Sequence, residues 1–161
     1  LYAIGLIAGD LVNVYNGNAG KEGWEKITLA STIGGMVINT AGVTLAHGME
    51  HPASGLRDIV HGKGLAALTP AIIEASYTGN ESKFADIAKL FGGKEAKDLA
   101  LKIRELLKSI NLNCTLSDLG IEEKDIPWMA ENCMKVSAAS VANNPVVFTQ
   151  EQIADIYKKA L

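Results

Sequence analysis

The chain contains few cysteines, and the two that are present do not form a recognisable motif. Cys114 and Cys133 are the only cysteines among the 161 residues, and they are too far apart in the sequence for a Cys-x-x-Cys pair. Two cysteines cannot build the dense disulfide framework of a small secreted domain. We therefore expect two small, half-buried thiols in a protein of a reducing, cytoplasmic compartment.

The sequence also lacks a stripe of basic residues. Lys and Arg number 15 against 18 Asp and Glu, which gives a formal net charge of −3, and the two signs are interspersed. Even the most basic stretch, residues 94–108, contains Glu95, Asp98 and Glu105, as is usual for a solvated helix face. Nucleic-acid binding requires concentrated positive charge, so we expect no nucleic-acid partner.

The sequence contains no evident membrane-spanning segment or signal peptide. Residues 27–46 carry no charge and are long enough to cross a bilayer, but polar residues and glycines interrupt them. A buried helix explains this run better, and we expect no membrane association.

The chain opens at Leu1 in a pattern typical of the middle of a helix, without a basic segment or a cleavage site. This predicts a fragment of a longer protein.

No stretch alternates apolar and polar residues over the length of a strand, so no sheet is expected. Helical periodicity is clearest in residues 94–110, where apolar positions recur at i, i+3, i+4 and i+7. Pro52 with Gly55 should end one long helix, and Pro70 should kink or divide another. Thr149 and Gln152 have capping-box spacing. The predicted helices are 1–14, 22–51, 61–77, 82–90, 94–110, 126–137 and the residues after Thr149. We predict an all-α, multi-helix domain over residues 1–161, with seven or eight helices.

The three histidines of the chain all lie between positions 47 and 61. His47 and His51 are four residues apart and share one face of a helix. His61 follows the break predicted at Pro52 and Gly55, and a turn there can return its ring toward His47. Neutral imidazoles are good ligands for Fe, Zn, Cu or Ni. The cluster therefore predicts a metal or proton-transfer site.

Two readings of these histidines do not depend on any wider similarity. Residues 47–51 fit the pattern H-x-x-E-H, in which His47 and His51 would bind zinc and Glu50 would act as the general base of a peptidase. Pro52 directly afterwards would end the helix where such a site needs support. The other reading is a non-catalytic helical interaction module, which separately buried histidines would favour.

A longer run of residues surrounds the three histidines. The run is Ala46-His47-Gly48-Met49-Glu50-His51-Pro52-Ala53-Ser54-Gly55, followed by Val60-His61-Gly62-Lys63-Gly64-Leu65-Ala66-Ala67-Leu68-Thr69-Pro70. It resembles the signature of the iron-containing (group III) alcohol dehydrogenases. The histidine separations of four and fourteen residues agree with the family pattern. Residues 30–44 and the end of the chain, from Asn143-Asn144-Pro145 to Leu161, resemble the corresponding parts of the family. Arg57, Asp58 and Val60 depart from the aromatic residue and the proline that relatives often have.

This resemblance implies the C-terminal, helical half of a dehydroquinate synthase-like fold. It implies that His47 and His61 bind Fe²⁺, or another divalent metal such as Zn²⁺. His51 would be catalytic, near the reacting centre without binding the metal, and would help to relay the alcohol proton. The activity implied is interconversion of an alcohol and an aldehyde or ketone by hydride transfer with NAD or NADP.

The rest of such an enzyme would lie before Leu1. Two further metal ligands of the family, an Asp and a His, are expected there, together with an N-terminal α/β domain that binds most of the cofactor. The chain has no G-x-G-x-x-G loop, which agrees with that domain being absent. We therefore expect the fragment alone to be inactive. The expected partners are a small-molecule alcohol or aldehyde, and the resemblance is compatible with a homo-oligomer.

Overall fold

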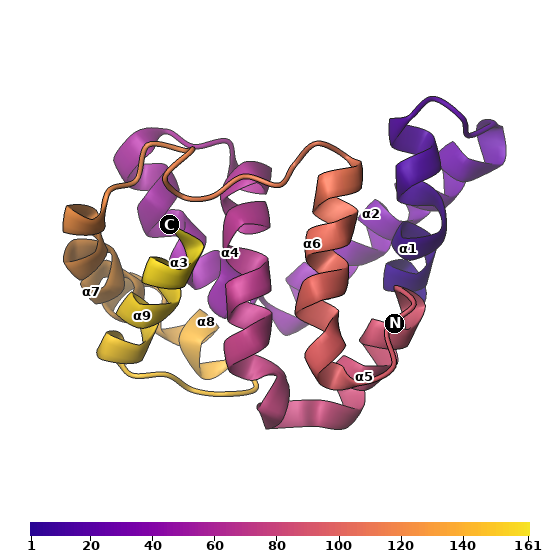
Figure 1. Cartoon of the computed structure of the whole chain (residues 1–161). Coiled ribbons are helices and arrows are strands. Elements are labelled where there is room, and N and C mark those ends of the chain that lie inside the picture. The colour runs from indigo at the N-terminus through magenta and orange to yellow at the C-terminus, as the bar shows by residue number, and fades with distance from the viewer. The chain divides into compact units, whose positions relative to one another are not determined.

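The computed structural model describes all 161 residues, and all of its regular elements are helices (Figure 1). The α-helices are α1 Tyr2–Tyr15, α2 Lys21–Ala41, α3 Leu45–Arg57, α4 His61–Ser76, α5 Glu81–Leu90, α6 Leu99–Ser109, α7 Ile126–Val136, α8 Ala138–Ala142 and α9 Gln150–Ala160. Short 3₁₀ turns occupy Tyr77–Asn80, Ala96–Asp98 and Glu123–Asp125. The predicted all-α class is confirmed, and the one helix not predicted is the five-residue α8.

The helices form two compact units. Unit 1 comprises Leu1–Gly42 and Glu81–Asn111, and so contains α1, α2, α5 and α6. Within it, α1 and α2 lie side by side, and α5 contacts both α6 and the turn before it (Figure 1). Unit 1 buries little of α2, whose buried residues are Gly23 and Ala30, so the prediction that the uncharged run from residue 27 onward is a buried helix was wrong for this part of the chain. Its exposed large side chains are Trp24, Leu29, Met36, Val37 and Ile38.

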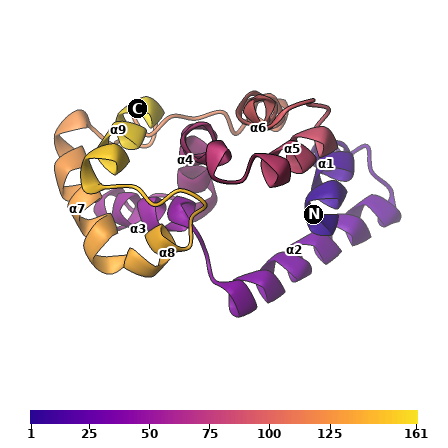
Figure 2. The same ribbon diagram turned by 90° about the horizontal axis from the view of Figure 1, so that it is seen from below.

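Unit 2 comprises Val43–Asn80 and Leu112–Leu161, and it contains all three histidines. In it α3 contacts α4, α7 and α8, while α9 contacts α4 and α7 (Figure 2). The helices meet in a hydrophobic core whose fully buried members include Leu45, Met49, Ala53, Leu68, Leu116, Met129, Ala130, Cys133, Ile153 and Tyr157. On α3 the core residues recur every four positions, so this helix has one apolar face and leaves another for polar side chains.

The long helix predicted for residues 22–51 is in fact two helices. Its first part, α2, ends at Ala41, and Gly42 has φ +71, a backbone conformation that only glycine adopts without strain. Val43 and Thr44 separate it from α3, and Thr44 is the extended N-cap residue of α3. The sequence prediction treated Gly42 as one glycine among several within a helix, so it missed the break.

The effect predicted for Pro52 was wrong, and Pro70 does not divide its helix. Pro52 lies inside α3, which continues to Arg57, and Pro70 lies inside α4, which is a single helix. A proline in a helix interior costs about 3 kcal/mol. Both residues are buried in unit 2, and packing of the surrounding apolar face offsets that cost. The helix break before His61 is real, but it lies at Asp58, which ends α3 in the left-handed region with φ 51.

Several terminal signals in the sequence act as predicted. Thr149 and Gln152 form a reciprocal capping box at the start of α9, and Pro127 occupies the first turn of α7. The chain leaves α5 through Gly92, which has φ +80.

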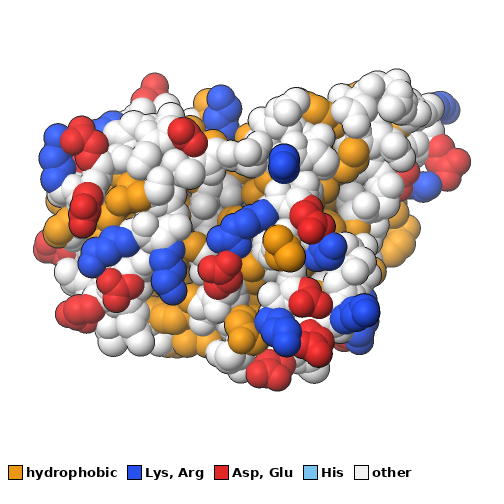
Figure 3. Space-filling view, in the orientation of Figure 1, with side chains coloured by type: hydrophobic (Ala, Val, Ile, Leu, Met, Phe, Trp, Pro, Cys, Tyr) orange, Lys and Arg blue, Asp and Glu red, His pale blue; other side chains and the backbone are white.

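On the face shown in Figure 3 acidic and basic side chains are interspersed over the surface.

No single helix of the chain combines the length and the hydropathy needed to span a membrane. Only α2 and α3 taken together, across the break between them, meet both requirements.

Candidate functional site

The structure brings the three histidines of the chain together in unit 2. The ring centroids of His47 and His61 are 5.2 Å apart, the shortest of the three separations. His51 lies 6.1 Å from His47 and 6.0 Å from His61. His47 is half-buried, whereas His51 and His61 are exposed. The predicted cluster is therefore formed, with imidazole rings that are accessible from solvent.

Two helices and the turn between them position these rings. His47 and His51 are one helical turn apart on α3, which places both on the same face. Asp58 then ends the helix: its N–H makes the last helical hydrogen bond, to the carbonyl of Ser54 at 2.8 Å, and its left-handed backbone turns the chain away from α3. His61 follows at the first position of α4, which packs against α3. A sharp turn and helix packing, and not sequence proximity alone, thus bring His61 to His47.

A buried carboxylate supports the exposed ring of His61. Oε2 of Glu50 lies 2.5 Å from Nδ1 of His61, within hydrogen-bonding distance. The side chain of Glu50 is 0% exposed, while that of His61 is 50% exposed. The other oxygen, Oε1, accepts a hydrogen bond from the hydroxyl of Ser54. Both carboxylate oxygens of Glu50 are therefore engaged beneath the histidine cluster.

Charge and burial act together on His47. Its pKa lies below the usual value of a histidine, first because the ring is partly buried and then because His61 and His51 are nearby cations when protonated. The negative charge of Glu50 acts in the opposite direction. A lowered pKa favours the neutral imidazole, which is the form that binds metals.

The 161 residues do not contain a complete metal site. No group of three or more His, Cys, Asp or Glu side chains is arranged to hold a metal ion. His47 and His61, the closest pair, can supply two nitrogen ligands, and further ligands would have to come from elsewhere.

The position of Glu50 does not suit the peptidase reading. A general base must reach a water molecule on the metal. Glu50 is instead fully buried, and its oxygens bond to Ser54 and His61. The H-x-x-E-H pattern is present in the sequence, but its glutamate does not face an open site. The proximity of the histidines likewise gives no support to the reading as a non-catalytic module, which separate burial would have favoured.

Sequence reasoning missed Glu50 in this role, and it missed Ser54 and Gly64 altogether. Glu50 and Ser54 are four residues apart and thus share a face of α3, while Gly64 is three residues after His61 on α4. Helical spacing could have placed each pair on one face. It could not have shown that the two faces meet.

Two of the positions that depart from the family pattern have structural roles. Nε of Arg57 donates to the carbonyl of Gly120 at 2.9 Å, and its Nη2 lies 2.6 Å from the carboxylate of Asp125. Asp58 ends α3. Arg57 thus ties the end of α3 to the segment before α7.

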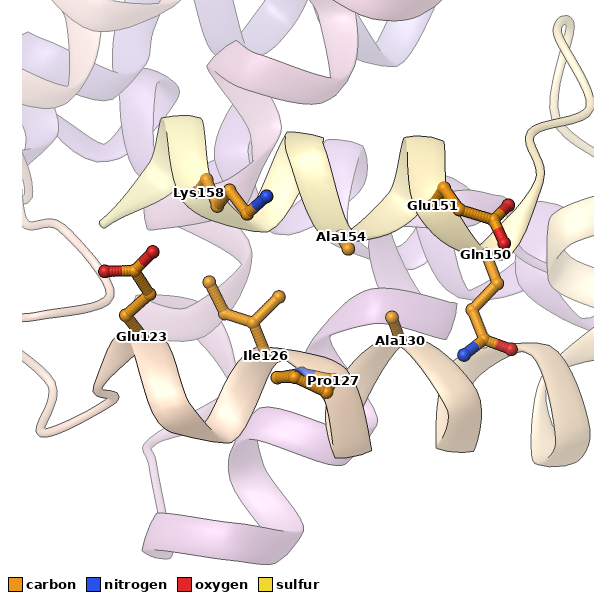
Figure 4. A pocket seen from close by; sticks show the side chains of 8 residues that line it. All are labelled: Glu123, Ile126, Pro127, Ala130, Gln150, Glu151, Ala154 and Lys158. Atoms are coloured by element: carbon orange, nitrogen blue, oxygen red, sulfur yellow. The ribbon is translucent and has the colours of Figure 1, made fainter.

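A surface groove of about 280 Å³ lies between α7 and α9 (Figure 4). Apolar side chains form its middle, with Glu123 and Lys158 at one end and Gln150 and Glu151 at the other. None of the three histidines lines it. We therefore place the candidate site at the histidine cluster and not in this groove.

The chain is all-α, and its three histidines form a cluster in unit 2. Comparison with known proteins gives the family. Residues 1–161 match the description "Fe-containing alcohol dehydrogenase family, C-terminal". The chain belongs to this family, in agreement with the resemblance found in its sequence.

Individual relatives agree with this assignment. The 1,3-propanediol dehydrogenase of Klebsiella pneumoniae is 34% identical over 99% of this chain and 43% of its own length. Lactaldehyde reductase of Escherichia coli K12 is 30% identical over 98% of this chain and 42% of its own length. The structure of an alcohol dehydrogenase from Oenococcus oeni has a TM-score of 0.88 at 28% identity, covering 99% of this chain and 43% of that one. The chain thus spans less than half the length of these relatives.

Proposed function

We propose that this chain is the metal-binding helical domain of an iron-dependent alcohol dehydrogenase. The complete enzyme would interconvert an alcohol and an aldehyde or ketone by hydride transfer with NAD or NADP. One observation carries the proposal: His47 and His61, from either side of a helix break, have ring centroids 5.2 Å apart. Family membership over the whole chain supports it.

The residues present fit a divalent metal such as Fe²⁺ or Zn²⁺. Imidazole nitrogen suits both ions, and metal–nitrogen bonds of about 2.0–2.1 Å require that the two rings be close neighbours. His47 and His61 meet this requirement and would be the two ligands from this chain. The lowered pKa of His47 keeps its ring in the neutral, metal-binding form. The resemblance assigns the remaining ligands to an Asp and a His outside these 161 residues.

The metal, when bound, would polarise the alcohol oxygen and favour loss of its proton. His51 is the residue that we assign to that proton. Its ring is exposed, and the centroid of that ring lies 6.1 Å from that of His47 and 6.0 Å from that of His61. A histidine in this position can exchange protons with both the substrate hydroxyl and the solvent.

We assign the nicotinamide cofactor mainly to a part of the protein outside these residues. The relatives are more than twice as long as the segment they share with this chain. The chain itself has no glycine-rich phosphate-binding motif. It follows that the 161 residues alone should not catalyse hydride transfer.

The names of the relatives guide the choice of substrate. Proteins called 1,3-propanediol dehydrogenase and lactaldehyde reductase act on small oxygenated molecules, and we propose a small alcohol or aldehyde here. We also propose a cytoplasmic location, on the basis of two unpaired cysteines.

The test uses the complete protein, assayed with NAD and NADP against small primary alcohols that include 1,3-propanediol. We expect alcohol-dependent reduction of the cofactor that disappears after metal removal by a chelator and returns with Fe²⁺ or Zn²⁺. Elemental analysis should follow the same loss and return. Full activity in protein shown to be metal-free would refute the proposal.

A further inference from the structure

The hydrogen bond between Glu50 and His61 joins a fully buried group to a half-exposed one. Glu50 has a side-chain exposure of 0% and His61 one of 50%. A buried carboxylate is unfavourable unless hydrogen bonds and a nearby positive charge compensate it. Here the carboxylate lies directly behind the ring that faces the cluster. Its place in the fold thus links the interior of unit 2 to the candidate metal site.

The hydrogen bond between Glu50 and His61 requires one proton, and its position determines which ring nitrogen can bind a metal. An ionised carboxylate has only acceptor oxygens, so Nδ1 of His61 must carry the proton of the 2.5 Å hydrogen bond. Nε2 then keeps its lone pair and is the only ring nitrogen free to bind a cation. The opposite arrangement, with the proton on the carboxyl group, would leave a proton on Nε2 of a neutral ring and block metal binding there.

The surroundings of Glu50 fix its carboxylate in place. The Ser54 hydroxyl donates to Oε1, and the same hydroxyl lies 3.0 Å from the carbonyl of Ile59, in the turn before His61. On α4, a Cβ at Gly64 would lie 2.7 Å from Oε1 and 2.8 Å from Cγ of Glu50. Only a glycine at position 64 lets α4 approach the carboxylate without displacement. The two helices are therefore shaped around this side chain.

Glu50 is hydrogen-bonded to only one histidine of the cluster. Among the three rings, that of His61 alone has a carboxylate hydrogen-bonded to a nitrogen. His61 is also the first residue of α4 and directly follows a turn. A ring at the first position of a helix, half exposed to solvent, needs an external contact to hold one orientation.

We infer that Glu50 is a positioning residue for the metal. Its carboxylate holds the proton of His61 on Nδ1 and orients the ring so that Nε2 faces the cation. Hydrogen-bonded carboxylates behind metal-binding histidines have this effect in general, and their loss typically weakens metal binding about 10–100-fold. The inference rests on the proposed function, because it presumes that His61 is a ligand.

Two measurements on the complete protein test the role of Glu50. The first is ¹⁵N NMR of the histidine rings in metal-free protein, with the His61 signals assigned from their absence in His61→Gln. We expect a neutral His61 ring protonated on Nδ1, and a mixture of the two forms in Glu50→Gln. A purely structural role would not predict this change. A wild-type ring protonated on Nε2 would overturn the inference.

The second measurement is Zn²⁺ affinity, determined by competition with a chelator. Glu50→Gln should bind Zn²⁺ about 10–100-fold more weakly than the wild type. Ser54→Ala, which leaves the contact with His61 in place, should have a smaller effect, and Glu131→Gln, at an exposed position of α7, should have none. Circular dichroism should show that each variant is folded.

The outcomes separate the two proposals. If His61→Gln loses Zn²⁺ but Glu50→Gln binds it as tightly as the wild type, the role of Glu50 is refuted and the proposed function stands. If His47→Ala and His61→Gln both bind Zn²⁺ like the wild type, the proposed function itself is refuted, and the role of Glu50 with it.

Discussion

The hydroxyl of Tyr157 donates a hydrogen bond of 2.5 Å to the carbonyl oxygen of Met49. Both residues are fully buried, and the bond joins α9, at the end of the chain, to the middle of α3. Met49 directly precedes Glu50. The C-terminal helix therefore supports the backbone from which the buried carboxylate and two of the histidines extend. Burial, followed by the nearby Cys133 and Glu50, raises the pKa of Tyr157, so its hydroxyl remains a donor over the whole physiological range.

Replacement of Tyr157 by Phe removes this hydrogen bond and keeps the ring. We expect the free energy of unfolding to fall by about 0.5–1.5 kcal/mol, the usual contribution of a single hydrogen bond. Urea unfolding followed by circular dichroism would measure it. Tyr2→Phe is the matched control, because Tyr2 is 67% exposed, and it should leave stability unchanged. Equal effects of the two variants would show that the buried hydrogen bond contributes nothing.

Replacement of each histidine should separate the ligands from the proton relay. His47→Ala and His61→Ala each remove a ligand, so both should lose metal and activity. His51→Ala should keep the metal but slow turnover about 10²–10⁴-fold, the typical contribution of general acid–base catalysis. Metal content by elemental analysis, measured beside kcat for each variant, checks this. Loss of metal from His51→Ala, with metal retained in His61→Ala, would contradict our assignment.

Two glycines of α4 offer a paired test of the space around Glu50. A Cβ at Gly64 would lie 2.7 Å from Glu50 Oε1, whereas a Cβ at Gly62 would have no heavy atom within 4 Å. Gly64→Ala should therefore destabilise the protein by about 1–3 kcal/mol through overpacking. Gly62→Ala should be neutral, or stabilising by up to about 1 kcal/mol, because alanine favours the helix. Thermal unfolding of both variants measures the difference, and similar melting temperatures would argue against a tight contact at position 64.

The two cysteines should differ in reactivity. Cys133 is fully buried, and burial raises the pKa of its thiol to about 11. At pH 8 only about one Cys133 in a thousand would be a thiolate, the form that reacts, and access to it is blocked as well. Cys114 is half-buried. Alkylation followed by mass spectrometry should modify Cys114 first and Cys133 only after unfolding. Cys114→Ser serves as the control, and rapid labelling of Cys133 in that variant would contradict the prediction.

Local patterns in the sequence determined much of the fold. The absence of alternating strands and the helical spacing of apolar residues predicted an all-α chain, which the structure confirms. Capping at Thr149 and the position of Pro127 were readable because they depend on neighbours along the chain. The four-residue spacing of His47 and His51 predicted a common face for the same reason.

Tertiary structure alone decided where helices continue and which groups meet. Pro52 was expected to end its helix, yet Pro52 and Pro70 both lie inside continuous helices, because burial of the surrounding apolar faces outweighs the local cost. The contact between Glu50 and His61 depends on the left-handed turn at Asp58 and on the gap left by Gly64, on different helices. The spacing of residues in the sequence indicates which face of its helix a residue occupies. Which other face packs against it is set by the energy of the whole core, and that is why the carboxylate behind His61 became visible only in the folded chain.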